Sequence, residues 1–106
     1  MAWTVFLTPD AAQELEDLPD DVQASFARIR ALIQDHGLER VRGPHVDHIQ
    51  GPLWEMRLKG RDGIARALYV AASGQRVIVV RVFVKKTQQT PRREIELASR
   101  RAESFR

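Results

Sequence analysis

Basic residues in the second half of the chain are the ones whose types and spacing could do chemistry. Arg57 and Arg66 lie within two predicted strands, and Lys85 and Lys86 follow a third. A guanidinium on a strand must form an ion pair, reach water or bind an anion, because its unpaired burial costs several kcal/mol. Arginine can hold two phosphate oxygens at once, and preorganised cations stabilise charge that grows on a phosphate. Phosphate is therefore the predicted ligand of these residues.

The distribution of charge points to the same class of partner. Residues 1–50 contain nine Asp and Glu against four Arg, whereas residues 51–106 contain thirteen Lys and Arg against five acids. The overall formal charge of +3 therefore hides an acidic half of −5 and a basic half of +8. Such a separation is typical of a protein whose basic surface meets a polyanion. The alternative is a basic face that only keeps the protein soluble.

Length and composition predict one domain that spans residues 1–106, with 43% hydrophobic residues and little room for a second core. No apolar stretch approaches the roughly 18 residues of a membrane span, and the apolar segment at residues 3–8 is too short for a signal peptide. The chain contains no cysteine, which excludes disulfides, thiolate metal sites and cysteine nucleophiles. We expect a cytoplasmic protein with no membrane partner.

The first half of the sequence predicts a strand, two helices and a connection. Alternation over residues 3–8 indicates a short strand, and Thr8 and Pro9 are typical of a helix start, with the helix over residues 9–18. A second apolar stripe at helical spacing begins after Pro19 and ends at Gly37. We expect both helices, acidic outside and apolar inside, to cover one face of a sheet. Residues 38–50 show no clear pattern and predict an irregular connection, with Gly51-Pro52 as the break before the sheet.

The second half predicts three antiparallel strands over residues 53–58, 64–72 and 76–84, joined by hairpins at residues 60–63 and 73–75. In the first of these, Trp54, Met56 and Leu58 share one face and Glu55 and Arg57 the other. Thr90-Pro91 repeats the helix-start signal and opens a C-terminal helix. The predicted fold class is α+β: a small antiparallel sheet with a mixed edge, two N-terminal helices packed on one face, and a C-terminal helix.

Three parts of the sequence carry a resemblance to a known family: residues 53–57 (LWEMR), the pair Arg66 and Tyr69, and residues 83–95 (FVKKTQQTPRREI). They resemble the phage-derived, HigB-like branch of the RelE/ParE toxin superfamily, over nearly the whole chain. The resemblance implies a RelE-like fold, a helix-turn-helix antitoxin as partner, and cleavage of mRNA in the ribosomal A site. The same fold also serves inhibition of DNA gyrase.

The resemblance also implies roles for particular residues. Metal-free RNA cleavage uses the 2′-hydroxyl as the internal nucleophile, so the protein needs cations more than a nucleophile of its own. Several relatives carry a tyrosine or histidine near the C-terminal end for acid–base work. This chain has no His after His48 and no Tyr after Tyr69. Glu55 is one candidate for the general base, since it shares a strand face with Arg57, and Tyr69 is another, which could instead stack on a base. The implied catalytic cations are Arg57, Arg66, Lys85 and Lys86, and the implied RNA contacts are Lys59, Arg61, Arg81, Arg92 and Arg93.

Several of these residues have a structural alternative. Arg66 could form a salt bridge with Glu55 across the sheet, and Arg81, in phase with Val77, Val79 and Phe83, fits a structural or cleft-lining arginine better than a catalyst. Tyr69 and Trp54 are more often core than site residues at such strand positions. Lys85 and Lys86 could protect a strand edge against aggregation.

A metal site is not expected, and neither is any other cofactor. His45 and His48 lie three residues apart, but no third convincing ligand accompanies them. We therefore predict a toxin of a type II toxin–antitoxin system that acts as a ribosome-dependent mRNA endonuclease and inhibits translation. The alternatives are a non-enzymatic inhibitor of a protein such as gyrase, and an RNA-binding module without catalysis. The basic strand face favours a nucleic-acid target.

Overall fold

A computed structural model describes residues 2–41, 43, 45–85 and 89–105. The chain forms β1 (Thr4–Leu7), α1 (Pro9–Glu16), α2 (Asp20–His36), a short 3₁₀ helix η1 (Leu38–Arg40), β2 (Val46–Gln50), β3 (Leu53–Gly60), β4 (Gly63–Ala72), β5 (Arg76–Lys85), α3 (Arg92–Ala102) and η2 (Glu103–Phe105). The strands form one five-stranded sheet in the order β1-β5-β4-β3-β2. β1 runs parallel to β5 and all other neighbours are antiparallel. This confirms the predicted α+β class and its mixed edge.

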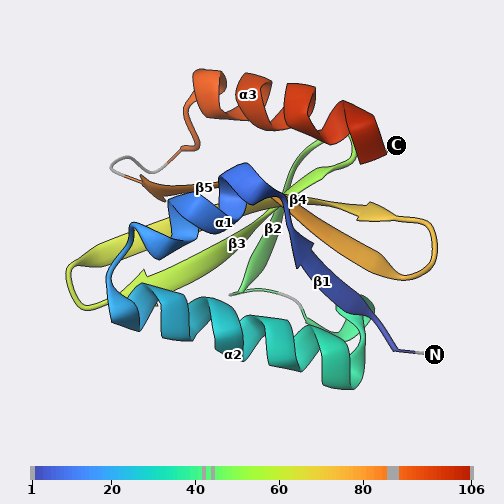
Figure 1. Cartoon of the computed structure of the whole chain (residues 1–106), viewed down its shortest axis with the longest axis horizontal. Coiled ribbons are helices and arrows are strands. Elements are labelled where there is room, and N and C mark those ends of the chain that lie inside the picture. Colours follow the sequence, from blue (N-terminus) through green and yellow to red (C-terminus); the bar gives the residue numbers. More distant parts are fainter. Residues whose placement is uncertain (1, 42, 44, 86–88, 106) are drawn as a thin grey trace.

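Helices cover both faces of the sheet (Figure 1). α1 and α2 pack on one face, where Leu15, Phe26 and Ile33 join strand residues such as Met56 and Val79 in one apolar core. On the opposite face, Ala98 and Ala102 of α3 close a second, smaller core that strand residues complete, namely Leu53, Leu68, Val70, Ile78, Val80 and Phe83. The sheet is therefore buried on both sides along most of its length.

Local signals explain the start of α1 and the end of α2. The Thr8 hydroxyl accepts a hydrogen bond from the Ala11 N–H at 3.1 Å, and Pro9 occupies the first turn. α1 ends at Glu16, two residues before the predicted end. Gly37 follows α2 with φ at +90°, a conformation that favours glycine. The predicted positions of both helices are confirmed.

The prediction of an irregular connection over residues 38–50 is wrong. Residues 46–50 form β2, an edge strand antiparallel to β3 in which Val46 lies opposite Met56 and Asp47 opposite Glu55. Gly51, with φ at +51°, turns the chain between the two strands, so Gly51-Pro52 forms a hairpin loop and not a break before the sheet. An edge strand needs only one apolar face, and β2 is short and rich in polar residues, which hid it from pattern reading.

A bulge in β5 changes the phase of the residues beyond it. Leu68 pairs with Arg81 while Tyr69 pairs with Val79, so Val80 is the extra residue. Val79 then packs in the core under α1 and α2, whereas Phe83 packs in the core under α3. The predicted common phase of Arg81 with Val79 and Phe83 is therefore wrong, because strict alternation fails at a bulge.

Candidate active site

Three strands bring the predicted cations together on the α3 side of the sheet. Arg57 of β3 lies directly opposite Arg66 of β4, which in turn lies opposite Phe83 of β5. One step nearer the β3–β4 hairpin, Lys59 lies opposite Ile64, which lies opposite Lys85. Glu55 shares the face of Arg57 by strand alternation. We call Glu55, Arg57, Arg66 and Lys85, with Asp47 of β2 and Thr90, the Arg66 cluster.

Arg66 and Glu55 form a buried pair at the centre of this cluster. Arg66 is 7% exposed and Glu55 is 3% exposed. Arg66 Nε lies 3.6 Å from Glu55 Oε2, which makes an ion pair but is too long for a hydrogen bond. The other carboxylate oxygen, Glu55 Oε1, accepts a hydrogen bond from the Thr90 hydroxyl at 2.6 Å. The predicted salt bridge across the sheet is therefore present, and Thr90 fixes the carboxylate that forms it.

Arg57 has a carboxylate partner on the edge strand. Its guanidinium donates to Asp47 Oδ2, and Asp47 faces Glu55 in the β2–β3 register. Two like charges directly opposite each other in a sheet repel, as Arg57 and Arg66 do here. Asp47 and Glu55 offset that repulsion for one arginine each. Lys85 adds a third cation, so among the described residues of the cluster three cations face two carboxylates.

The electrostatics of the cluster reflect this excess of positive charge. Burial lowers the pKa of Arg66; Arg57 lowers it further, while Glu55 and Asp47 oppose the change. The pKa of Lys85 is lowered by burial and then by the nearby Arg66 and Arg57, against the opposing effect of Glu55 and Asp47. Both shifts mean that the charged forms of Arg66 and Lys85 are less stable here than in water. A bound anion would relieve that cost.

Some hydrogen-bond donors of the Arg66 guanidinium have no acceptor among the described residues. Among the residues that the structure describes, its buried Nε and Nη1 have no hydrogen-bond partner. Such a group costs free energy in a folded protein and calls for an explanation, since most buried polar groups are paired. Together with the unbalanced charge, this favours an anionic ligand at the cluster. Phosphate fits best, because Arg57 and Lys85 are partly exposed and can reach it while Arg66 supports it from below.

The structure places the remaining predicted RNA contacts in three regions. Lys59 and Arg61 are exposed at the β3–β4 hairpin, and Arg92 and Arg93 are exposed in the first turn of α3, just after Thr90. Arg81 is different, because its guanidinium forms ion pairs with Glu14 and Glu94, as its structural alternative predicted. The predicted role of Lys86 lies outside the described residues.

Tyr69 does not join the Arg66 cluster. It pairs in register with Trp54 and Val79 and packs into the core on the α1 and α2 side, opposite to the face that carries Arg66. Burial also raises the pKa of Tyr69, which makes its phenolate still rarer near neutral pH. Grouping Tyr69 with the catalytic cations was therefore wrong, because Tyr69 lies three positions from Arg66 on the same strand, and an odd separation places two residues on opposite faces.

Reasoning from the sequence missed two members of the cluster. Asp47 was assigned to an irregular segment, and Thr90 was read only as the helix-start signal of α3, although its hydroxyl contacts Glu55. The Gly-Pro pair between a short run with two β-branched residues, Val46 and Ile49, and the alternating run of β3 was the available signal for a hairpin, and hence for Asp47. No local signal could have paired Thr90 with Glu55, because 35 positions separate them in the sequence.

The histidines considered as metal ligands have other contacts. His48 Nε2 lies 2.8 Å from the Gly51 carbonyl oxygen, and its ring packs against Trp54 with 4.9 Å between the ring centroids. Within the described ranges of the chain, no three His, Asp or Glu side chains gather as a metal site would require. A search of the same residues for a helix long and apolar enough to cross a membrane finds none.

The fold is that of RelE-type proteins. The structure matches that of the toxin–antitoxin complex RelBE2 from Mycobacterium tuberculosis with a TM-score of 0.59 and 19% identity, over 80% of this chain and 100% of the matched chain. It also matches the archaeal RelE–RelB complex from Pyrococcus horikoshii OT3 with a TM-score of 0.60 and 17% identity, over 81% of this chain and 98% of that one.

A family model identifies the chain more specifically. Residues 13–103 match the family described as phage derived protein Gp49-like (DUF891), and the chain belongs to this family. No curated protein shows significant similarity to the sequence. The predicted phage-derived origin and RelE-like fold are confirmed by these matches, whereas the assignment to a HigB-like branch stays a prediction.

Proposed function

We propose that the protein is the toxin of a toxin–antitoxin system and acts as a ribosome-dependent mRNA endonuclease. Membership in a phage-derived family and a RelE fold support the class of protein. One observation carries the activity: the buried Arg66, whose Nε and Nη1 have no hydrogen-bond partner among the described residues, lies beside further cations on the same face of the sheet. Both matched structures are complexes with a partner protein, so a cognate antitoxin is proposed here too. Such a toxin acts in the cytoplasm, where mRNA is translated.

The chemistry proposed for the cluster is electrostatic. The 2′-oxygen of the substrate loses its proton and attacks the adjacent phosphorus; the bond to the 5′-oxygen breaks, and that oxygen takes up a proton. Negative charge builds on the phosphate oxygens during this step, and the cations are positioned to stabilise it. Arg57 and Lys85 contact the phosphate in this proposal, and Arg66 contributes from its buried position.

Glu55 is better placed to orient Arg66 than to accept a proton from substrate. Its carboxylate is buried, one oxygen accepts the hydrogen bond of Thr90, and the other faces Arg66. We therefore assign Glu55 and Thr90 as positioning residues. The proton acceptor would then come from the ribosome, from the RNA or from solvent. Dependence on the ribosome follows, since an open basic strand face lacks the walls needed to orient a flexible RNA strand.

The test is a translation extract programmed with one defined mRNA, with and without active ribosomes. Purified protein is expected to cut the mRNA inside its reading frame, with 5′ ends mapped by primer extension, and to leave the same RNA intact when ribosomes are absent. The Arg66→Ala variant serves as control for a contaminating nuclease. Intact mRNA together with inhibition of DNA supercoiling would replace the proposal with inhibition of gyrase.

A further inference from the structure

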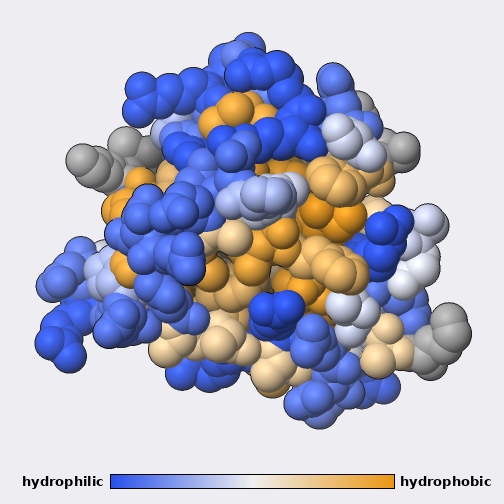
Figure 2. All heavy atoms as spheres, in the orientation of Figure 1, coloured by the Kyte–Doolittle hydropathy of each residue, from blue (hydrophilic) through white to orange (hydrophobic). Residues whose placement is uncertain are grey.

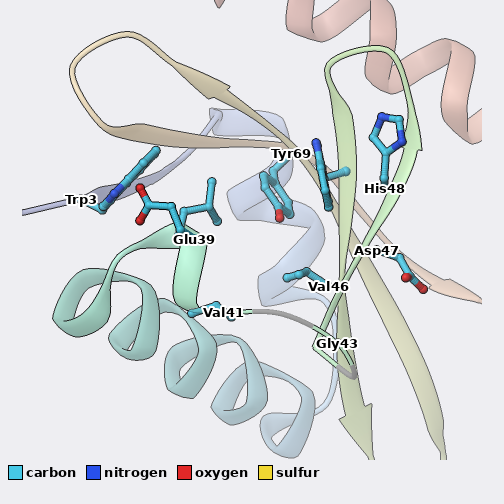
Figure 3. Close-up of a pocket in the computed structure, with 10 residues that line it drawn as sticks. Trp3, Glu39, Val41, Gly43, Val46, Asp47, His48 and Tyr69 are labelled. Atoms are coloured by element: carbon cyan, nitrogen blue, oxygen red, sulfur yellow. The ribbon is translucent and has the colours of Figure 1, made fainter.

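A second site lies on the other face of the sheet. A cavity of about 510 Å³ is bounded by the start of β1, by η1 and by the β2–β3 hairpin, and both tryptophans of the chain, Trp3 and Trp54, line it together with Tyr69. Figure 3 shows Trp3 and Glu39 on one side of the cavity and Tyr69 and Val46 on the other. We call it the tryptophan pocket. Its volume falls within the roughly 300–1,000 Å³ that is usual for ligand sites.

The aromatic walls of the tryptophan pocket are held in place although they are partly exposed. Trp54 is 38% exposed, but its ring rests against His48, whose Nε2 is tied to the Gly51 carbonyl. On the other wall, Gly37 leaves room for two groups at once. A Cβ at this position would lie 2.7 Å from Glu39 Oε1 and 3.5 Å from Trp3 Cδ1. The carboxylate and the indole edge therefore meet over Gly37.

The charge of the tryptophan pocket is negative. Glu39 lies beside Trp3, and α2 ends at His36 next to it, so the negative end of the helix dipole points at this region. Among the described lining residues there is no Lys or Arg. Aromatic faces combined with a carboxylate are the chemistry that recognises a guanidinium or ammonium group. Apolar residues such as Leu38 and Val41 supply a surface for the rest of the ligand.

We propose that the tryptophan pocket binds a segment of a partner protein through an arginine side chain and a neighbouring aliphatic one. The guanidinium lies against the indole of Trp3 near Glu39, and the aliphatic side chain covers Val41 and Val46. A strand of RNA is disfavoured, because its phosphates would approach the carboxylate of Glu39 and the negative end of the α2 dipole. The site does not depend on ribonuclease activity, since Arg66 lies on the opposite face.

Because both tryptophans line the pocket, their intrinsic fluorescence reports its occupation. The full-length protein is titrated with an acetylated, amidated Leu-Arg dipeptide and with the same peptide carrying citrulline, which keeps the shape of arginine and removes its charge. The arginine peptide is expected to shift the emission and to bind at least about tenfold more tightly, the scale of a desolvated cation–π contact. Trp3→Phe and Trp54→Phe, each of which leaves one reporter, should both retain a signal.

Two carboxylate variants test the role of charge. Glu39→Gln should weaken binding of the arginine peptide about tenfold and leave the citrulline peptide unchanged. Glu16→Gln, at an exposed position of α1 away from the pocket, should change neither. Thermal melting checks that both variants fold. Equal binding of the two peptides, no signal up to about 10 mM peptide, or tighter binding of adenosine monophosphate than of the arginine peptide would each overturn the proposal, the last in favour of a nucleotide pocket.

Discussion

Arg81 and Arg66 both lie on the sheet among charged side chains. They differ in how many of their guanidinium donors form hydrogen bonds. Arg81 donates to both oxygens of Glu94 at 2.7 and 3.1 Å and to Glu14 at 2.6 Å. Its pKa is raised, chiefly by the hydrogen bond with Glu94. Arg66 has one carboxylate at 3.6 Å, two donors without a described partner, and a lowered pKa.

Side chains around Arg81 connect three elements, α1, β5 and α3, beyond the end of β1. Glu14 of α1 accepts the Val82 N–H at 3.0 Å, and Arg101 of α3 donates to the Val80 carbonyl at 2.8 Å and to Glu14. These contacts close the part of the β5 edge that the short β1 leaves open, next to the bulge. Figure 2 shows hydrophobic surface between α2 and α3 where β1 crosses in Figure 1, and Phe6 of β1 is 46% exposed.

The comparison separates structural from functional charge. The ion pairs of Arg81 with Glu14 and Glu94, and of Arg101 with Glu14, each join one element of the fold to another, so these charges stabilise the structure. In the Arg66 cluster, by contrast, the described cations outnumber the carboxylates, and two donor atoms of Arg66 have no described acceptor. Both features cost stability unless a ligand supplies the missing acceptor. The presence of a buried ion pair is therefore weak evidence of function. Whether all of its donors form hydrogen bonds is stronger evidence.

Replacement of Arg66 should give the largest effect on activity. Arg66→Ala is expected to lower the single-turnover rate of mRNA cleavage by a factor of about 100 or more, the scale of losing one preorganised donor to the transition state. Binding to ribosomes should change little, because Arg66 is buried and the exposed cations remain. The rate is measured at saturating protein and the affinity by cosedimentation. A folded Arg66→Ala variant with full activity would leave only the salt-bridge interpretation.

Replacement of Arg81 should have the opposite profile. Arg81→Ala removes the ion pair of Glu94 and one of the two ion pairs that Glu14 forms with Arg81 and Arg101. It is expected to lower the free energy of unfolding by about 2 kcal/mol, below the range for a fully buried pair since Arg81 is partly exposed. The cleavage rate of the folded fraction should be unchanged. Urea unfolding gives the stability, and the rate is measured well below the midpoint. A loss of cleavage without a loss of stability would instead assign Arg81 to the site, as the sequence-based RNA-binding prediction had it.

The sequence predicted the elements whose patterns are local and repetitive. The alternation around Met56 and the helical stripe of Phe26 and Ile33 each require only neighbouring residues, so strand β3 and helix α2 could be located from them. Strand β2 was not predicted, because one apolar face of five residues is a weak signal in a polar segment. The bulge at Val80 was not predicted either, since it depends on pairing with β4.

The site was predicted less completely than the fold. Cations that recur on strands could be read from residue types, and Glu55, Arg57 and Arg66 do meet. The satisfaction of donors could not be predicted, because the carboxylates that distinguish Arg81 from Arg66 come from α1 and α3, far away in the sequence. The same reason hid the tryptophan pocket, which joins Trp3 to Trp54.

The contribution of Lys85 to ribosome affinity should depend on salt and on pH. Lys85→Ala should weaken ribosome association and reduce the slope of log affinity against log salt by about 0.7 to 0.9, the value for one phosphate contact. Arg100→Ala, which removes an exposed cation of α3, serves as control. Since burial and Arg66 lower the pKa of Lys85, the wild-type protein should lose affinity as the pH rises through the lowered pKa, earlier than an ordinary lysine would. Lys85→Arg should abolish that loss, and a loss that persists would have another source.

The same shift has a consequence for stability. Because the folded pKa of Lys85 lies below the unfolded one, keeping Lys85 charged costs stability below the folded pKa, and the cost is relieved as the pH rises toward the unfolded value. The Lys85→Ala variant lacks this cost. Its advantage in melting temperature over the wild type should therefore be present near neutral pH and shrink at alkaline pH.

Thr90 should give the smallest effect and the most specific one. Its hydroxyl donates to Glu55 Oε1 at 2.6 Å and, among the described residues, contacts Arg66 only through this carboxylate. Thr90→Val keeps the shape and removes the donor, and one hydrogen bond to a charged group corresponds to a decrease of about tenfold in the cleavage rate. Thr90→Ser keeps the donor and should retain the wild-type rate. The salt dependence of ribosome binding should be the same in all three proteins, because no phosphate contact is lost. If Thr90→Val keeps the wild-type rate while Thr90→Ser lowers it, the methyl group and not the hydroxyl matters, and Glu55 does not position Arg66 through Thr90.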